Sequence, residues 1–131
     1  PFIVINPDIY ADFDFTAILA RHQPGEGLMV AHWQDDARDF GLLRIENDLI
    51  REFTEKPKEP GGGYINASFY IMHPEHLEGF GDGFFMLEKE VFPKLAREGK
   101  LRVYIHKGFW NDIGTEDRLA DVRKNFNFRD L

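Results

Sequence analysis

Two aspartates stand where apolar segments end, and this placement would let them share one metal ion. Asp8 directly follows the run Phe2–Ile5, whose apolar, β-branched character predicts a strand buried on both faces. Asp112 lies in a strand–turn–helix junction between Trp110 and Gly114. Two carboxylates suit Mg²⁺, which completes its shell with phosphate oxygens and waters. The competing interpretation is that each aspartate only starts a turn or caps the next helix.

A lysine and a glutamate at the end of another predicted strand have the chemistry to contact a phosphorylated sugar. Pro57 holds the preceding Lys56 extended, so the ammonium group can bind a phosphate as a point charge. Glu55 can accept hydrogen bonds from sugar hydroxyls. The competing interpretations are a solvated surface lysine and a glutamate that pairs with a nearby arginine.

Two polar side chains share one face of the strand predicted over residues 64–72. Asn66 and Ser68 point to one side, and the apolar residues between them point to the other. The polar face either faces solvent or contacts ligand hydroxyls. Gly41, after Phe40, either lets a backbone group approach a ligand or only relieves the start of a strand.

Strands and helices that alternate along the chain must position these residues. Apolar patterns predict strands over residues 2–5, 27–33, 41–45, 49–55, 64–72 and 101–106, and helices near residues 15–22, 76–80, 85–98 and from 115 onward. Leu119, Val122 and Phe126 form the apolar stripe of the last helix. The pattern indicates one α/β domain with a Rossmann-like mixed, mostly parallel sheet and helices on both faces. Ligands bind such sheets at the carboxyl ends of the strands.

Composition excludes several classes of function. The 131 residues include no cysteine, which excludes disulfides, thiolate catalysis and zinc sites built on cysteine. A net charge of −7 argues against nucleic-acid and membrane surfaces. The single serine, Ser68, lies outside any GxSxG segment, so a serine nucleophile is not predicted. The absence of signal and spanning segments favours the cytoplasm.

Taken in order, these segments resemble the sugar-1-phosphate nucleotidyltransferases. The matching segments are Phe2–Asp8, Glu55–Pro57, Ile65–Ala67 and Trp110–Thr115, with Phe40–Gly41 as a weaker fifth. The resemblance covers nearly the whole chain. It implies the nucleotide-diphospho-sugar transferase fold, with residues 1–131 as the C-terminal part of a single catalytic domain.

The resemblance also implies a reaction and the residues that perform it. A sugar-1-phosphate oxygen would attack the α-phosphorus of a nucleoside triphosphate and release pyrophosphate, as in other in-line phosphoryl transfers. Asp8 and Asp112 would hold Mg²⁺ and act with Lys56, which would contact the sugar phosphate. The partners would be the sugar 1-phosphate, the triphosphate and possible further copies of the chain. The residues implied in substrate contact are Gly41, Glu55, Lys56, Asn66, Ser68 and Trp110.

The chain departs from the family pattern at three places. Pro7 stands where the family usually has glycine, which removes a backbone donor, and Ser68 stands where glycine is frequent. The family's glycine-rich nucleotide-binding loop has no counterpart here, and the chain opens at Pro1 inside an apolar run. We therefore expect a fragment that lacks the N-terminal part and is inactive alone.

The substrates are predicted less sharply than the reaction. The segments Ile65–Ala67 and Trp110–Thr115 favour mannose 1-phosphate with GTP. The opening segment and residues 99–122 instead resemble muramate uridylyltransferases, so uridylyl, thymidylyl or cytidylyl transfer to another sugar phosphate stays open. Two further hypotheses are a non-catalytic homologue that senses sugar phosphates and an unrelated α/β domain whose acids only cap helices.

Overall fold

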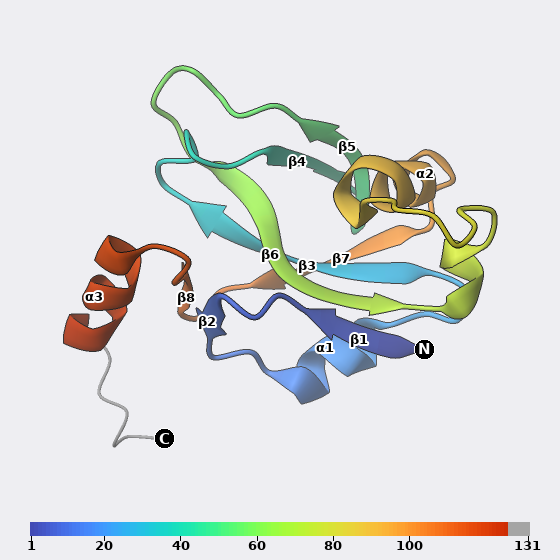
Figure 1. The fold of residues 1–131 in the computed structure, drawn as a ribbon, viewed down its shortest axis with the longest axis horizontal. Coiled ribbons are helices and arrows are strands. Elements are labelled where there is room, and N and C mark those ends of the chain that lie inside the picture. The colour runs from blue at the N-terminus through green and yellow to red at the C-terminus, as the bar shows by residue number, and fades with distance from the viewer. Residues whose placement is uncertain (126–131) are drawn as a thin grey trace.

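A computed structural model describes residues 1–125 as a mixed α/β fold built on a curved six-stranded sheet (Figure 1). Its strands are β1 (Phe2–Ile5), β3 (Gly27–Gln34), β4 (Leu42–Glu46), β5 (Leu49–Thr54), β6 (Gly63–Met72) and β7 (Leu101–His106). A second, two-stranded sheet pairs β2 (Ile9–Ala11) with β8 (Trp110–Asp112). The helical segments are α1 (Phe15–Arg21), the 3₁₀ turn η1 (Pro74–Leu77), the π-helical turn η2 (Leu87–Val91), α2 (Phe92–Arg97) and α3 (Glu116–Asn125).

The strand order of the large sheet is β1-β6-β3-β7-β5-β4. The mixed α/β class is confirmed, but the expectation of a mostly parallel sheet is wrong for the described strands. Only β3 and β7 pair in parallel, because β6 lies antiparallel between β1 and β3. β1, β3 and β7 still run in the same direction, so their carboxyl ends meet at one edge. β4 also pairs with β6 at Leu42 and Ile65, which curls the sheet back on itself.

The sheet separates two hydrophobic clusters, and β3 contributes to both. Along β3, Met29 and Ala31 enter the cluster covered by α2, whereas Leu28 and Val30 enter the cluster that contains Ile18 of α1. All four β3 residues are at most 1% exposed. Figure 1 shows α1 and α2 on opposite sides of the central strands. The expectation of helices on both faces is therefore confirmed.

The first strand differs from its prediction in burial. β1 pairs with β6 alone among the described strands, and Phe2, Ile3 and Ile5 are 36–45% exposed. The apolar run correctly predicts a strand, but this strand lies at an edge of the described sheet. The reason is that composition records how apolar a strand is and does not record which neighbours cover it.

The predicted helix over residues 85–98 is divided into two parts. It begins with η2, where the N–H of Phe92 donates to the carbonyl of Leu87, five residues earlier, and continues as α2. Pro93 has no N–H and so cannot make the ordinary helical bond at this point. The helix ends where expected, at Gly99, whose φ is +68°.

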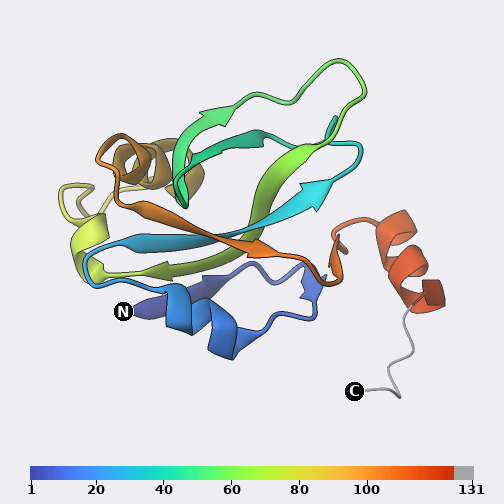
Figure 2. The same ribbon diagram turned by 180° about the vertical axis from the view of Figure 1, so that it is seen from behind.

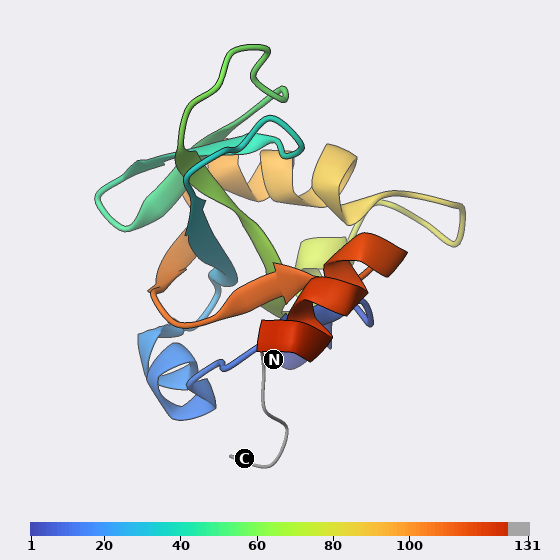
Figure 3. The same cartoon turned by 90° about the vertical axis from the view of Figure 1, so that its left-hand side faces the viewer.

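One end of the fold collects the segments that surround Asp8 and Asp112. The β2·β8 pair lies at the carboxyl ends of β1, β3 and β7, and α3 lies beyond it (Figures 2 and 3). Thr115 caps α3 by accepting a hydrogen bond from the N–H of Arg118 at 3.3 Å. Phe126, predicted on the α3 stripe, lies outside the described residues. Within residues 1–125, no helix has the length and apolar character needed to cross a bilayer.

Candidate active site

A short antiparallel ladder brings the two predicted metal ligands together. β2 and β8 pair with Ile9 opposite Asp112, and the N–H of Ile113 donates to the carbonyl of Asp8 at 2.8 Å. Asp8 therefore lies beside the end of β8, although 104 positions separate the two aspartates in the sequence. Neither β2 nor β8 was predicted, because three-residue strands carry too little periodicity to detect.

Gly114 lets the two carboxylates approach the same point. A Cβ atom on Gly114 would lie 3.0 Å from Oδ1 of Asp112 and 3.2 Å from Oδ2 of Asp8. The close approach explains this glycine, since a side chain would enter the space between the two acids. The donor set of two hard carboxylate oxygens fits Mg²⁺, which takes one or two carboxylates from a protein and its other ligands from phosphates and water. Within residues 1–125, no cluster of three or more ligand side chains is present.

The two aspartates differ in their hydrogen bonds. Oδ1 of Asp112 accepts from the N–H of Gly114 at 2.7 Å, and Oδ2 accepts from Nη1 of Arg118 at 2.8 Å. The bond from Gly114 confirms that Asp112 helps to form the turn after β8. The side chain of Asp8 is exposed, and it has no hydrogen bond or ion pair to any residue in 1–125.

Arg118 is a site residue that the sequence analysis missed. It lies in the first turn of α3, and its Nη2 is 3.5 Å from Oδ2 of Asp39. Its guanidinium carbon is 5.6 Å from the centre of the Phe40 ring. Arg118 thus connects Asp112 to the loop that leads into Gly41. The helix dipole disfavours a cation in the first turn, so its position could have signalled a nearby acid.

Two residues expected to contact the sugar share one cavity. Gly41 and Asn66 both line a cavity of about 260 Å³, together with Leu42, Leu43, Phe53, Thr54 and Glu88. Gly41 lies close to β5, since a Cβ atom there would be 3.0 Å from the carbonyl oxygen of Thr54. The walls combine apolar side chains with an amide and a carboxylate, which is the character of a small-molecule site.

The side chain of Asn66 is held in place by its own strand. Oδ1 of Asn66 accepts from the N–H of Ser68, and Nδ2 donates to the hydroxyl of Tyr70, both at 2.9 Å. Ser68 has a left-handed φ of 59° where the β3·β6 register shifts. A φ in this region favours glycine. This agrees with the sequence analysis, in which Ser68 stands where the sugar-1-phosphate nucleotidyltransferases frequently have glycine.

Tyr70 completes this face of β6, on which Asn66 and Ser68 are half-buried. Tyr70 is 1% exposed. Burial raises its pKa to about 12, although hydrogen bonds from Asn66 and Ser68 oppose the shift. Its phenol therefore keeps its proton at neutral pH. The prediction that Asn66 and Ser68 share a face is confirmed, and Tyr70 lies on the same face.

The other predicted substrate residues occupy different environments. Glu55 and Lys56 are exposed just beyond the end of β5, and the described structure records no contact between them and either aspartate. Trp110 is 8% exposed. Its indole N–H donates to the carbonyl of Ala67 at 3.0 Å, and its ring stacks on His32. This position gives Trp110 a packing role that holds β8 against β6.

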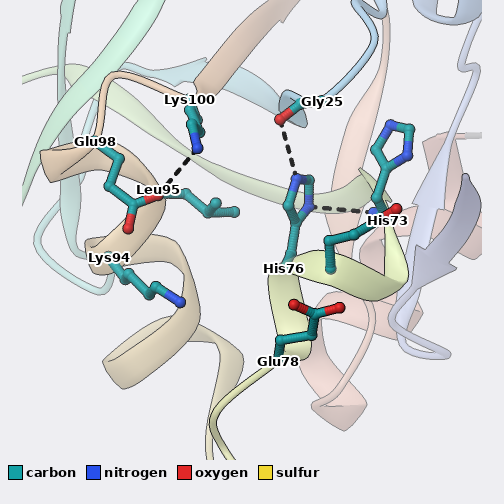
Figure 4. Close-up of a pocket in the computed structure, with 9 residues that line it drawn as sticks. Gly25, His73, His76, Glu78, Lys94, Leu95, Glu98 and Lys100 are labelled. Carbon is teal, nitrogen blue, oxygen red and sulfur yellow. Dashed lines mark hydrogen bonds and ion pairs between the residues drawn. The ribbon is translucent and has the colours of Figure 1, made fainter.

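A cavity of about 500 Å³ lies at the opposite end of the sheet. It is lined by the loop before β3, by η1 and by α2, and Figure 4 shows His76 between Gly25 and His73. Nδ1 of His76 accepts from the N–H of His73 at 3.2 Å, and Nε2 lies 3.3 Å from the carbonyl oxygen of Gly25. Both ring nitrogens of His76 are therefore engaged within the protein.

Comparison with known proteins identifies the family. The family described as "Nucleotidyl transferase" matches residues 1–127. The chain belongs to the nucleotidyl transferase family. The sugar-1-phosphate nucleotidyltransferase resemblance found in the sequence is thereby confirmed.

Individual members of the nucleotidyl transferase family agree with this assignment. The chain is 36% identical over 118 residues to the mannose-1-phosphate guanylyltransferase catalytic subunit beta of Dictyostelium discoideum, covering 87% of this chain and 33% of that protein. The Danio rerio protein of the same name is 37% identical, with the same coverage. A solved structure of HddC from Yersinia pseudotuberculosis, complexed with GMP-PN, superposes with a TM-score of 0.80 at 25% identity, covering 96% of this chain and 55% of that one. The chain thus spans about a third of the length of the curated relatives it matches.

Proposed function

We propose that this chain is the C-terminal part of the catalytic domain of a Mg²⁺-dependent sugar-1-phosphate nucleotidyltransferase. The convergence of the Asp8 and Asp112 carboxylates beside Gly114 carries the proposal. Family membership supports the general reaction. Asp8 follows the carboxyl end of β1 and Asp112 ends β8, and two such converging carboxylates are suited to a cation that accompanies phosphate groups.

The residues of the chain would act by positioning and by charge. Mg²⁺, when bound by Asp8 and Asp112, would neutralise charge on phosphate oxygens. Lys56 would hold the sugar phosphate, and Asn66 with the backbone of Gly41 would hold the sugar in the cavity they share. The phosphate oxygen would attack the α-phosphorus in line, the bond to the β-phosphate oxygen would break, and pyrophosphate would leave. No covalent intermediate with the protein is required.

The proposed substrates are mannose 1-phosphate and GTP. The guanylyltransferases among the relatives support this choice. Because the chain spans about a third of those relatives, we propose that it lacks the glycine-rich nucleotide-binding loop and does not turn over substrates alone.

The test is a pyrophosphate-release assay on the full-length protein and on residues 1–131. Mannose, glucose and N-acetylmuramate 1-phosphates are each combined with GTP, UTP, dTTP and CTP, with and without Mg²⁺. We expect Mg²⁺-dependent release by the full-length protein, greatest with mannose 1-phosphate and GTP, and none by residues 1–131. Preference for another pair would correct the substrates, and metal-independent release would contradict the role of the two aspartates.

A non-catalytic protein that senses sugar phosphates is the second candidate. Pro7 favours it, because it removes a backbone donor directly before Asp8. Thermal shift separates the two, since a ligand that binds only the native state raises its stability. Stabilisation by a sugar phosphate without stabilisation by any triphosphate, and without turnover, would favour the sensor.

A further inference from the structure

Glu88 lines the same cavity as Gly41 and Asn66, and no sequence pattern singled it out. We propose that Glu88 is a specificity-determining residue whose carboxylate accepts hydrogen bonds from hydroxyls of the bound sugar. This inference rests on the proposed function, because it requires a sugar 1-phosphate in the cavity.

The η2 turn fixes the position of Glu88 although its side chain is exposed. The next residues of this helical segment, Val91 and Phe92, are 0% and 1% exposed and belong to the core cluster under α2. The backbone bond from Phe92 to Leu87 closes the wide turn around Glu88. Wide turns of this kind are rare and occur frequently at functional sites.

Glu88 also differs from its acidic neighbour in the same turn. Oε2 of Glu90 accepts from the N–H of Met86 at 2.7 Å, so Glu90 serves the turn itself. In contrast, Glu88 has no hydrogen bond or ion pair with any residue in 1–125. The carboxylate that faces the cavity is thus the one without a structural task.

The groups around Glu88 form a complementary set. Its negative charge acts on the Tyr70 hydroxyl, whose pKa it helps to raise, and that hydroxyl accepts a hydrogen bond from Asn66. The second amide hydrogen of Asn66 is left for a ligand. A donor amide and an acceptor carboxylate can together bind the hydroxyls of one sugar, since each hydroxyl both donates and accepts.

The remaining walls suit a single sugar ring. Leu42, Leu43 and Phe53 offer apolar surface to the C–H groups of the ring. The volume of about 260 Å³ lies below the roughly 300–1,000 Å³ typical of drug-sized ligands. A site that hydrogen-bonds a hydroxyl discriminates strongly against analogues that lack it, because its polar groups are then left unpaired.

The experiment compares E88Q with E90Q in the full-length protein. Glutamine keeps the size of each side chain and removes its charge, and the glutamine of E90Q can still accept from Met86. Steady-state kinetics are measured with mannose 1-phosphate and with its 2-, 3-, 4- and 6-deoxy analogues. We expect E88Q to raise KM for the sugar phosphate about tenfold or more, with KM for the triphosphate unchanged and E90Q equal to wild type.

The deoxy analogues separate sugar recognition from a structural role. In the wild type, the analogue that lacks the hydroxyl bound by Glu88 loses kcat/KM, and in E88Q that loss shrinks. Unchanged KM in E88Q, or identical deoxy penalties in wild type and E88Q, would overturn the role of Glu88 while leaving the proposed function intact. Failure of the wild type to turn over any sugar 1-phosphate would overturn the proposed function and, with it, the role of Glu88.

Discussion

The two ends of the sheet differ in how their polar groups are satisfied. At the carboxyl ends of β1, β3 and β7, the carboxylate of Asp8 has no hydrogen bond or ion pair with the described residues, and it shares the space beside Gly114 with the Asp112 carboxylate, which pairs with Arg118. At the other end, around a cavity of about 500 Å³, His73 and His76 are bonded within the protein, whereas the side chains of Glu75 and Glu78 have no hydrogen bond or ion pair with any residue in 1–125. The cavity of about 500 Å³ therefore lies where the histidine side chains already have partners within the protein. The proposed function therefore rests on the convergence of two carboxylates and not on cavity size.

Histidines join the segments at the end of the sheet opposite Asp8 and Asp112, here called the distal end. Nε2 of His22 lies 2.8 Å from Nε2 of His73, and their rings stack. His76 joins η1 to the loop at Gly25. The charges near these histidines have both signs. Glu26 and Glu75 raise the histidine pKa values, and Lys100 and the N-terminus lower them. These bonds join the end of α1, the end of β6 and the start of β3, so this end has a structural task.

The largest expected effect would break the comparison at the end of the sheet that carries Asp8 and Asp112. We expect D8N and D112N each to lower kcat/KM of the full-length protein more than about 100-fold, because a metal-held charge contributes several kcal/mol to such reactions. The matched control is D121N, which changes an exposed carboxylate on α3. Pyrophosphate release as a function of Mg²⁺ concentration measures the effect. Equal losses of kcat/KM in D8N, D112N and D121N would contradict the proposal that Asp8 and Asp112 hold the metal ion.

A smaller effect concerns the backbone of β6 beside the cavity that Gly41 and Asn66 line. Ser68 has a φ of 59°, a region that costs a residue with a side chain about 1–2 kcal/mol relative to glycine. Both S68G and S68A remove the hydroxyl, but only S68G removes this strain. We expect S68G to exceed S68A in free energy of unfolding by about 1 kcal/mol in urea denaturation. Equal stabilities would mean that the left-handed conformation is not kept in solution.

The smallest expected effect is a pH dependence at the distal end. Burial lowers the pKa of both His22 and His76 in the folded protein. Because the unfolded chain binds protons more readily, their contribution to stability is complete above about pH 6.5 and is lost as the pH falls below it.

Urea denaturation at pH 7.5, 6.5 and 5.5 measures this dependence. We expect H76Q to be less sensitive to pH than the wild type over this range, with turnover at pH 7.5 unchanged. Asp36 stays ionised over this pH range and does not contribute to the pH dependence, because hydrogen bonds from Arg38 lower its pKa to about 2. If H76Q keeps the pH dependence of the wild type, His76 is not the source of that dependence. If H76Q loses turnover at pH 7.5, the distal end affects the site at Asp8 and Asp112.

Local sequence signals determined most of the elements. The hairpin turn at Asn47 and Asp48 forms with φ of 51° and 61°, as asparagine and aspartate tolerate. The N-cap of α1 is Asp14, which accepts from the N–H of Ala17 at 2.9 Å. The stop at Gly99 is likewise local. These features depend on neighbouring residues alone, so the sequence is sufficient to predict them.

Only the tertiary structure decided which of the candidate residues meet. Asp8 and Asp112 were marked by residue type, but their meeting depends on the β2·β8 ladder, whose strands are too short to predict. Arg118 and Glu88 entered the two sites through packing between segments far apart in the chain. The exposure of β1 at an edge of the sheet and the antiparallel insertion of β6 were also missed. The physical reason is the same in each case, since a pattern in sequence fixes the face of an element and not the element that packs against it.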